Sequence, residues 1–393
     1  MRRVLFVDHV NRILGGAEVN LVELLADAGA RRAWDVTVAC SPDSPLDERL
    51  AAIGVRRVPY QFGKSVNELR VVGRSFPLLG AVRGLRALHA AGTRLRAILR
   101  ETRAEIAVSC TNKDHFAATA ACRRSRAASV WWVNDILSAD FFPAPARRGF
   151  CWRARRGAAR LAAVSEVARR ALVDQGLRPE LVTTVHNGIP LERYARQECG
   201  ALRRIIGAGD GEFLAGIVGR FTPWKGQDMV IRLARRWREA GLKGRFLLIG
   251  QAFNEDGPFE AALQEAMRGL EGVVHFVPFQ PDISAALSDL DVLLHASVKP
   301  EPFGRVVIEA MAVGVPVVAA RAGGVPEIIT DGRDGLLVPP GDEAAYVAAL
   351  RSLAENPARR AELAAAGRRT VEERFTVSRV QRDFERVFAE VAA

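Results

Sequence analysis

Residues 292–320 read VLLHASVKPEPFGRVVIEAMAVGVPVVAA and decide the fold of this 393-residue chain. Two short apolar runs, 292–295 and 315–319, enclose a segment with helical spacing that starts close to Gly304. Apolar runs of this length are typical of buried parallel strands, and the segment between them is long enough for a crossover helix. The stretch therefore predicts a β-α-β unit.

The same alternation of strand and helix continues along the chain in both directions. A turn-forming cluster at 187–190 separates two series. The sequence therefore predicts an α/β fold of two doubly wound, Rossmann-like domains, residues 1–190 and 191–375. The expected strands are 4–7, 36–39, 106–109, 130–133 and 161–164 in the first domain, and 214–218, 246–249, 273–277, 292–295 and 315–319 in the second.

Composition excludes several classes of protein. With 49% apolar and 26% charged residues, the chain can build packed cores and is neither disordered nor fibrous. No apolar run approaches the roughly 18 residues needed to cross a bilayer, and the run 4–7 is too short for a secretory signal, so we expect a cytoplasmic protein. The five cysteines are odd in number and widely spaced, so we expect buried thiols and not a disulfide framework or a zinc site. They are Cys40, Cys110, Cys122, Cys151 and Cys199.

The excess of positive over negative charge lies in the first half of the chain. Residues 1–190 hold 30 Lys and Arg against 17 Asp and Glu, whereas residues 191–393 hold 26 against 28. Such a half could attract nucleic acid, anionic lipid or an anionic substrate, but we favour a general bias of composition toward Arg and Ala, which needs no partner. No nucleic-acid recognition module is evident, so we expect no nucleic-acid partner.

Residues 141–165 contain six arginines, no acidic residue, and four aromatic residues. Interleaved basic and aromatic side chains can dock on an anionic membrane surface. The alternative is a solvated arginine face whose aromatic residues belong to the core. The aromatic residues are Phe141, Phe142, Phe150 and Trp152.

Three motifs follow expected strands and carry the chemistry. Gly15 and Gly16 open a helix, where backbone amides can approach an anion. The dinucleotide fingerprint is absent there, which disfavours a nicotinamide enzyme. In the loop 219–226, GRFTPWKG, Arg220 and Lys225 can converge on one diphosphate.

The third motif, EPFGRVVIEA at 301–310, is the strongest. Glu301 precedes a helix and Glu309 lies one to two turns into it. On an idealised helix the two carboxylates are separated by roughly 80° around the axis, so both can address one elongated ligand. The free amides between Gly304 and Val307 suit an anion. A helix with one favourable acid before its positive end would explain this motif without a ligand.

Together with 185–189, AVGVPVVA at 312–319, GGVPE at 323–327 and 331–339, these motifs resemble the retaining GT-B glycosyltransferases of family 4 over nearly the whole chain. The resemblance implies two domains that face each other across a cleft. It implies a nucleotide-sugar donor held by the second domain and a glycan or lipid-linked acceptor held by the first. Residues 376–393 would cross back onto the first domain.

The resemblance also implies roles for single residues. Arg220 and Lys225 would clamp the donor diphosphate, Glu301 would contact the sugar hydroxyls and Glu309 the ribose. The reaction would be a metal-independent front-face transfer without a cofactor, in which the leaving diphosphate takes the acceptor proton. Further donor contacts would come from Gly15 and Gly16 and from the backbone amides of Phe303, Gly304, Val306 and Val307.

One position departs from the family pattern. Many relatives carry a His where this chain has Asn134, and Asn cannot act as a base. Either Asp135 or His9 would orient the acceptor, or the donor phosphate acts alone, or the chain is a catalytically impaired nucleotide-sugar-binding protein. Asp289 and Asp291 mimic a metal motif but precede a strand, so we assign them no metal. We expect His115, His186, His275 and His295 to be structural.

Overall fold

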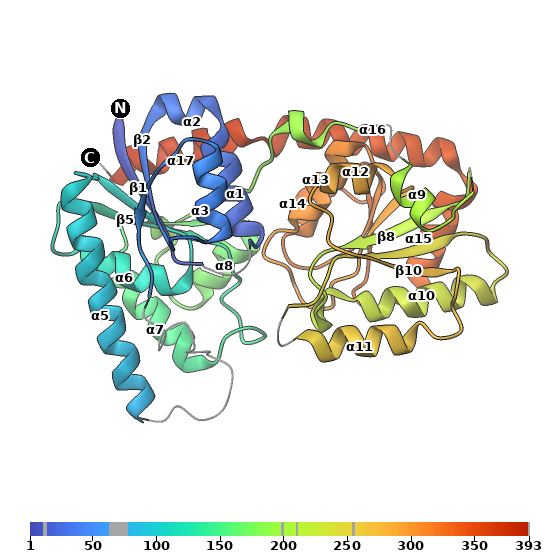
Figure 1. The fold of residues 1–393 in the computed structure, drawn as a ribbon, viewed down its shortest axis with the longest axis horizontal. Helices are drawn as coiled ribbons and strands as arrows, with labels where there is room; N and C mark the ends of the chain where they lie inside the picture. Colours follow the sequence, from blue (N-terminus) through green and yellow to red (C-terminus); the bar gives the residue numbers. More distant parts are fainter. Residues whose placement is uncertain (11–13, 63–77, 198–199, 210, 254–255, 392–393) are drawn as a thin grey trace. The chain divides into compact units, whose positions relative to one another are not determined.

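The computed structural model describes residues 1–10, 14–62, 78–197, 200–209, 211–253 and 256–391, without the side chains of 78–85. Cys199 lies outside the described residues. The chain divides into two compact units, which we call unit 1 (Met1–Gly188 and Val377–Ala393) and unit 2 (Ile189–Thr376). Both units are built on parallel β-sheets whose helices lie on the two faces of the sheet (Figure 1).

Unit 1 contains a seven-stranded parallel sheet in the order β3-β2-β1-β4-β5-β6-β7. The order reverses direction between β1 and β4, which is the switch point where open α/β sheets bind ligands. The strands are β1 (Arg2–Asp8), β2 (Trp34–Cys40), β3 (Arg56–Pro59), β4 (Ile106–Ser109), β5 (Ala128–Val133), β6 (Arg160–Ala163) and β7 (Val182–Thr184).

The helices of unit 1 bury one face each against this sheet. They are α1 (Gly16–Ala26), α2 (Ala28–Ala33), α3 (Pro45–Ala52), α5 (Leu78–Glu101), α6 (Asn112–Cys122), α7 (Ala144–Arg155), α8 (Glu166–Asp174) and α17 (Val377–Val391), with a 3-10 turn at Pro179–Leu181. Among the described residues, no helix combines the length and the apolar composition that a bilayer crossing requires.

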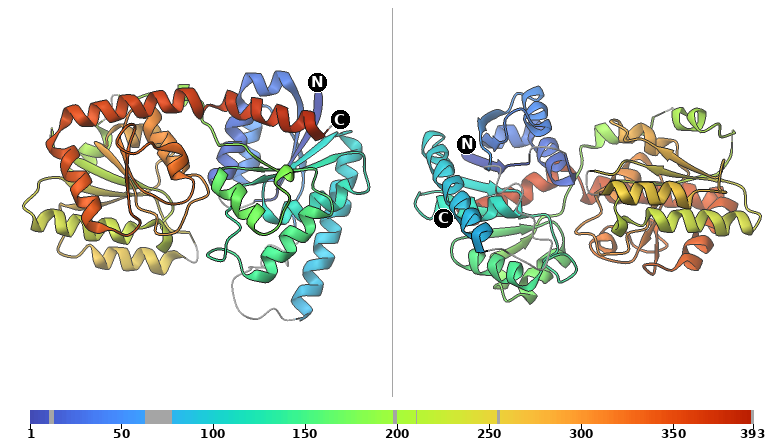
Figure 2. Two further views of the ribbon diagram at one scale, coloured as in Figure 1. Left: turned by 180° about the vertical axis from the view of Figure 1, so that it is seen from behind. Right: turned by 60° about the horizontal axis from the view of Figure 1, so that its bottom comes forward.

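The last helix, α17, is formed by the carboxyl-terminal end of the chain and packs against α1, α2 and β6 of unit 1 (Figure 2). Its buried face carries Phe384 and Phe388, whose rings contact Trp132 and Trp34 at centroid distances of 5.0 and 5.2 Å. Unit 1 is therefore completed by a segment that follows unit 2 in the sequence.

Unit 2 contains a six-stranded parallel sheet in the order β10-β9-β8-β11-β12-β13. The strands are β8 (Leu214–Val218), β9 (Arg245–Ile249), β10 (Val274–Val277), β11 (Val292–His295), β12 (Val317–Ala320) and β13 (Leu336–Val338). The direction of the order reverses between β8 and β11, so the loops that follow these two strands meet at the switch point of the sheet.

The α-helices of unit 2 are α9 (Ala201–Ile205), α10 (Gln227–Glu239), α11 (Gly257–Ala266), α12 (Ile283–Ser288), α13 (Arg305–Val313), α14 (Val325–Ile328), α15 (Glu343–Glu355) and α16 (Pro357–Arg374). Two 3-10 turns, η2 (Leu191–Tyr194) and η3 (Pro223–Lys225), precede α9 and α10. A continuous core of apolar side chains from the sheet, α10 and α15 includes Phe221, Trp237 and Tyr346, all buried.

The observed strands match the expected ones with small differences at their ends. Three strands were not expected, namely β3, β7 and β13. Each is short and lies at the edge of its sheet, so its residues need not be uniformly apolar. The four described cysteines, Cys40, Cys110, Cys122 and Cys151, are buried and free, as expected.

Candidate functional site

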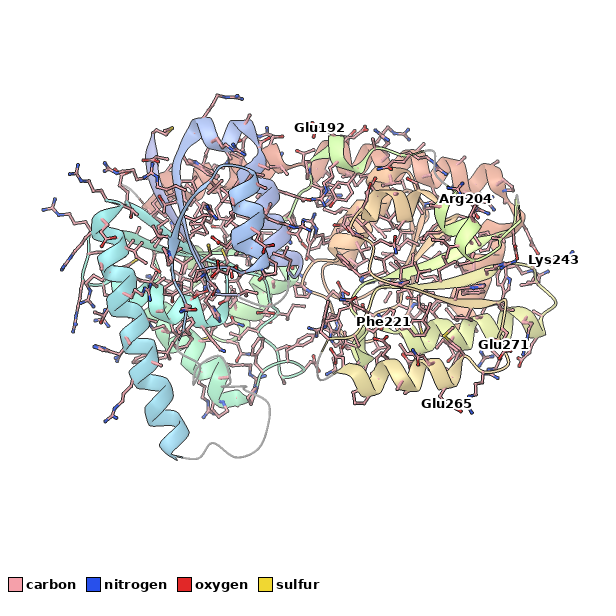
Figure 3. All side chains as sticks on the ribbon, viewed as in Figure 1. Glu192, Arg204, Phe221, Lys243, Glu265 and Glu271 are labelled. Carbon is pink, nitrogen blue, oxygen red and sulfur yellow. The ribbon has the colours of Figure 1, made fainter. Side chains whose placement is uncertain are left out.

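The loop after β8 presents Arg220 from a firmly anchored backbone. The amide of Gly219 donates to the carbonyl of Ile249 (3.0 Å), and that of Phe221 donates to the carbonyl of Gln251 (2.9 Å). The Phe221 ring is fully buried in the interior of unit 2 (Figure 3). Between these two anchors the Arg220 side chain is half exposed, and its Nε lies 3.4 Å from a carboxylate oxygen of Asp256. The guanidinium is thus held at one side and open to a ligand at the other.

Gly226 holds the end of this loop against the segment that follows β11. Its φ of +84° lies in the left-handed region, and a Cβ at this position would overlap the carbonyl of Ala296. Next to it, the amide of Val298 donates to the carbonyl of Trp224 (2.9 Å). Only glycine allows this approach, which brings Lys225 beside Glu301.

Lys225 and Glu301 form the central ion pair of unit 2. The ammonium contacts Glu301 Oε1 directly and also lies over the Trp224 ring, 4.5 Å from its centroid. The same oxygen accepts a hydrogen bond from Ser297 Oγ (2.7 Å) and lies 3.2 Å from His295 Nε2. Oε2 takes no hydrogen bond from any described residue, so it can accept one from a ligand hydroxyl.

The charge of Glu301 is maintained by these neighbours. Burial by itself would raise the pKa of this carboxyl, but the Lys225 ammonium and the His295 imidazole hold its pKa well below the ordinary value. Glu301 is therefore an anion at every physiological pH, although its side chain is only 7% exposed.

The backbone of Glu301 is fixed by the Gly323-Gly324 turn. A Cβ on Gly323, whose φ is +62°, would overlap the main chain of Glu301. The amide of Gly324 donates to the carbonyl of Glu301 (2.9 Å). This close approach explains why glycine occupies the expected motif at 323–327.

Helix α13 is preceded by its N-cap residue Gly304, which adopts a left-handed conformation at φ +101°. No described residue accepts a hydrogen bond from the backbone amides of Gly304 and Val306, which is usual at the amino end of a helix. The prediction for Val307 was wrong, because its amide donates to the carbonyl of Gly304 (2.9 Å). The Phe303 ring is buried against Phe375, with their centroids 5.7 Å apart.

Glu309 is held by two partners within unit 2. Its Oε1 accepts hydrogen bonds from Arg305 Nε (2.7 Å) and Tyr194 Oη (3.2 Å). Arg305 also donates to Tyr194 Oη (2.9 Å), which closes a triangle of three side chains. Oε2 of Glu309 is left without a hydrogen bond among the described residues and can accept one from a ligand.

The argument that placed Glu301 and Glu309 on one idealised helix was wrong. Helix α13 starts at Arg305, so Glu301 belongs to the preceding loop and its direction does not follow from helical geometry. Its position is set instead by Lys225 and by the turn at Gly323.

In unit 1, Gly15 and Gly16 form the start of α1. Gly15 is the N-cap residue, and its amide donates to Glu18 Oε2 (2.6 Å), so the acid at the first turn fixes the glycine pair. Burial raises the pKa of Glu18 despite these hydrogen bonds. Residues 11–13 lie outside the described residues.

His9 follows β1 and is paired with Asp114 at the start of α6. Its Nδ1 lies 3.0 Å from Asp114 Oδ2, and the same oxygen accepts from the His9 amide (3.1 Å) and from Thr111 Oγ1 (2.7 Å). The His9 ring rests on the edge of Phe62, with a centroid distance of 4.6 Å. Asp114 is fully buried, and the His9 side chain is 11% exposed.

The other two acceptor-side candidates are engaged in local hydrogen bonds. Asn134 Nδ2 donates to the carbonyls of Cys110 (3.3 Å) and Trp132 (3.2 Å). Asp135 Oδ2 accepts a hydrogen bond from Asn112 Nδ2 (2.8 Å). Burial raises the pKa of the Asp135 carboxyl, and this hydrogen bond offsets only part of the rise. Both side chains connect the end of β5 to the segment that follows β4.

Sequence reasoning did not single out four side chains that contact the candidate site residues. His295, expected to be structural, contacts the central carboxylate of Glu301. Tyr194 gave no sequence signal because its partner Glu309 is distant in the chain. Ser297 gave none because its contact with Glu301 depends on the conformation of the segment between them. Asp114 could have been suspected from Thr111, since Thr-x-x-Asp is a common start of a helix.

The side chains of the Asp-x-Asp motif contact neighbouring segments of unit 2. Asp289 accepts from the amides of Gly200 (2.5 Å) and Leu202 (2.7 Å). Asp291 pairs with Arg203 (2.9 Å). Among the described residues, no three His, Cys, Asp or Glu side chains are grouped as a metal site would need.

These features define a class: a two-unit α/β protein whose second unit brings together a buried carboxylate, a lysine and the amino end of a helix. Residues 14–193 match the family model described as Glycosyltransferase Family 4, and residues 200–370 match that described as Glycosyl transferases group 1. The chain belongs to this family of GT-B glycosyltransferases.

Similar proteins support the same placement. A D-inositol 3-phosphate glycosyltransferase of Kribbella flavida is 34% identical over 51% of this chain and 49% of its own. A GDP-mannose-dependent alpha-mannosyltransferase of Mycobacterium tuberculosis is 29% identical over 79% of this chain and 77% of its own. The crystal structure of Anabaena HepE in complex with UDP and glucose superposes with a TM-score of 0.84, at 26% identity, over 99% of this chain and 100% of that one. The chain spans about half the length of the first curated relatives that it matches.

Proposed function

We propose that the protein is a retaining glycosyltransferase that moves a sugar from a nucleotide-sugar donor to a glycan or lipid-linked acceptor. The observation that carries this proposal is the arrangement around Glu301, where one oxygen is saturated by Lys225 and Ser297 and the other is open. Glu309 repeats the pattern, with one oxygen held by Arg305 and Tyr194. Two oriented carboxylates beside a free helix amino end suit a ligand with hydroxyls at both sides of a diphosphate.

In the proposed reaction, unit 2 binds the donor. Arg220 and Lys225 neutralise the charge that grows on the diphosphate as its bond to the sugar breaks, and the amides of Gly304 and Val306 assist. Glu301 orients the sugar and Glu309 the ribose. The acceptor hydroxyl approaches the face from which the diphosphate leaves, so the anomeric configuration is retained without a protein nucleophile. Catalysis then consists mainly of positioning and charge stabilisation, with no cofactor.

A donor panel tests this function. The protein is incubated with UDP-, GDP- and ADP-sugars and hydroxyl acceptors, and the released nucleotide and the glycoside are read by mass spectrometry. We expect one donor to be consumed, with NMR showing the donor's anomeric configuration in the product. Full activity in excess EDTA is expected, because protein cations supply the charge. An inverted product, or a requirement for metal, would contradict the corresponding part of the mechanism.

The second candidate function is a nucleotide-sugar-binding protein that has lost transfer. It is favoured by Asn134, whose side-chain amide is occupied by two backbone carbonyls and cannot serve as a base. Calorimetric binding of a nucleotide-sugar without any transfer or hydrolysis across the panel would support this candidate instead.

For a lipid-linked acceptor, helix α7 offers a membrane-docking surface. Trp152 is 49% exposed, and the Arg156 guanidinium lies 4.7 Å from its ring centroid. Arg148 and Arg155 are also exposed on this helix, whereas Phe150 is buried in the core. Each basic residue near an anionic surface contributes about 1 kcal/mol. We expect flotation with liposomes that contain phosphatidylglycerol, and loss of flotation in Trp152→Ala/Arg156→Ala or in high salt.

A further inference from the structure

We propose that His295 takes over from Lys225 as the partner of Glu301 Oε1 when the Lys225 ammonium turns to the diphosphate of the donor. The inference rests on the proposed function and adds to it a positioning residue within unit 2. Lys225, Ser297 and His295 all approach the same carboxylate oxygen. Such an oxygen offers about two lone-pair sites, so one of the three groups is left without a full hydrogen bond.

The group left without a full hydrogen bond is His295. Its Nε2 lies 3.2 Å from Glu301 Oε1, but among the described residues neither ring nitrogen has a hydrogen-bond partner, and the side chain is only 4% exposed. Buried polar groups are nearly always hydrogen-bonded, and leaving one unpaired is unfavourable. The ring is thus close enough to bond the carboxylate, while Lys225 and Ser297 hold the oxygen that it would bond.

The two basic side chains differ in their freedom to move. His295 is the last residue of β11, where it is in register with Ala319 of β12, and its carbonyl accepts a hydrogen bond from Tyr346 Oη (2.8 Å). Lys225 lies in the turn η3, and its side chain is 22% exposed and carries the ammonium on a flexible four-carbon stem. A diphosphate can therefore draw the lysine toward itself while the imidazole stays beside Glu301.

Glu301 needs another partner once the ammonium is shared with a diphosphate. Its side chain is 7% exposed, and burial by itself would raise the pKa of this carboxyl. A buried charge that loses its partner is strongly destabilised. Ser297 remains on Oε1, but only through a neutral hydroxyl. Of the two remaining groups, only the imidazole can supply either an N–H donor or a positive charge, so His295 is the one that can restore the balance.

This exchange of partners links diphosphate binding to the orientation of Glu301. While His295 and Ser297 hold Oε1, Oε2 keeps the direction in which the proposed function places the sugar hydroxyls. The proton must then be on Nε2, the nitrogen that faces the carboxylate, because a carboxylate only accepts hydrogen bonds. His295 acts through Glu301, so it is a positioning residue and not a catalytic one.

The first test is the binding of UDP, GDP and ADP measured by calorimetry, which needs no turnover. It compares His295→Asn, whose amide is too short to follow Nε2, with His295→Gln, whose amide can reach the same oxygen. The matched control is His275→Gln, on β10 of unit 2. We expect His295→Asn to bind the preferred nucleotide about tenfold more weakly or worse, and the other two variants to stay within about twofold of the unchanged protein.

The loss of affinity should depend on the charge of Glu301. In a Glu301→Gln background no carboxylate needs compensation, so adding His295→Asn should not weaken nucleotide binding further. An equal loss in both backgrounds, or unchanged binding by His295→Asn, would overturn the inference, because a purely structural role of His295 does not depend on that charge.

A second test removes the lysine instead of adding a diphosphate. In Lys225→Ala, the ¹⁵N shifts of the His295 ring should report a proton on Nε2 that is hydrogen-bonded to Glu301. The melting temperature of Lys225→Ala/His295→Asn should fall by more than the two single losses together, because each residue compensates for the absence of the other. Additive losses, or a dominant Nδ1–H tautomer in Lys225→Ala, would overturn the exchange of partners.

The two tests separate this inference from the proposed function. Additive losses in a protein that binds and transfers from a nucleotide-sugar overturn the exchange of partners and leave the proposed function standing. A more than additive loss in a protein that binds none of the three nucleotides refutes the proposed donor site, while it supports His295 as the second partner of Glu301.

Discussion

At the scale of single residues, one carboxylate organises the second unit. Glu301 is joined to Lys225, 76 positions earlier in the chain, and to Ser297 and His295 from its own segment. All three contacts converge on one oxygen atom. The carboxylate is therefore a structural anchor for the lysine and, in the proposed function, an acceptor for ligand hydroxyls, and the two roles can be separated by substitution.

Lys225→Ala should lower the turnover of the donor by about 10²- to 10³-fold, the usual cost of removing one preorganised charge from a transition state. It should also lower the free energy of unfolding by about 1–3 kcal/mol, because the buried Glu301 loses a partner. Lys243→Ala, at the exposed surface of unit 2 (Figure 3), is the matched control and should change neither quantity.

The double variant Lys225→Ala/Glu301→Gln should regain most of the lost stability without regaining turnover, since the uncompensated charge is gone but the diphosphate still lacks its cation. Steady-state kinetics and urea unfolding of the three variants measure the two effects. Equal turnover in Lys225→Ala and Lys243→Ala would show that Lys225 does not act on the donor.

His115 gives a prediction for pH. The ring stacks on Trp131 at 4.7 Å and its Nδ1 is 2.8 Å from Ser109 Oγ, and burial lowers its pKa to about 3. An exposed His titrates near 6.5, so between about pH 6.5 and 3 the unfolded chain binds a proton that the folded chain excludes. The free energy of unfolding should therefore fall toward acid pH by about 1.4 kcal/mol per pH unit from this group.

In His115→Phe this contribution is absent. The free energy of unfolding should therefore fall less steeply toward acid pH, by the amount that one bound proton contributes, whatever the change in stability at neutral pH. His89→Gln removes an exposed imidazole and should keep the original slope. Urea unfolding between pH 7 and 4.5 measures both curves, and parallel curves for the protein and His115→Phe would exclude a buried neutral imidazole.

At the scale of elements, the loops after β8 and β11 form the site because glycines let their backbones touch. Gly226→Ala places a methyl group against the carbonyl of Ala296, in addition to the cost of about 1–2 kcal/mol for a left-handed conformation. Gly241→Ala should have only the conformational cost, since the φ of Gly241 is +70° and no atom lies within 4 Å of an added Cβ.

We therefore expect Gly226→Ala to lose more stability than Gly241→Ala and to bind nucleoside diphosphate at least tenfold more weakly, because Lys225 moves with the loop. Urea unfolding and calorimetric titration distinguish the two variants. Equal losses of stability and unchanged binding would mean that the loop adapts without moving Lys225.

The strands and loops show which structural features the sequence can predict. The run Leu214–Val218 is continuously apolar because β8 is buried between neighbours on both sides, and its bounds were predicted without error. Strand β3 (Arg56–Pro59) is exposed at the sheet edge and contains two arginines and a proline, so no periodicity marked it. Arg220, Lys225 and Glu301 were predicted as site residues because their loops carry glycine and proline. Tyr194 was not, because its role depends on a 3-10 turn that places it against Glu309.

At the scale of the whole molecule, the chain builds unit 1, then unit 2, and returns to unit 1 with α17. Residue burial in α17 matches the helical spacing of its apolar residues, with Val380, Phe384 and Phe388 inward. The stability of unit 1 therefore depends on a helix that follows unit 2 in the sequence. Each unit has its own core, so the two should respond separately to changes that affect only one of them.

Thermal unfolding should therefore show two transitions that can be assigned by substitution and by ligand. Phe384→Ala removes a fully buried ring that contacts Trp132, costs about 3–5 kcal/mol, and should lower the transition of unit 1 alone. Leu353→Ala, in the core of unit 2, is the matched control and should lower the other transition. A nucleoside diphosphate at 100 times its Kd should raise only the unit 2 transition, by about 2.7 kcal/mol of binding free energy. If calorimetry shows one transition that all three changes shift together, the units unfold as one and the independence argued from their separate cores is wrong.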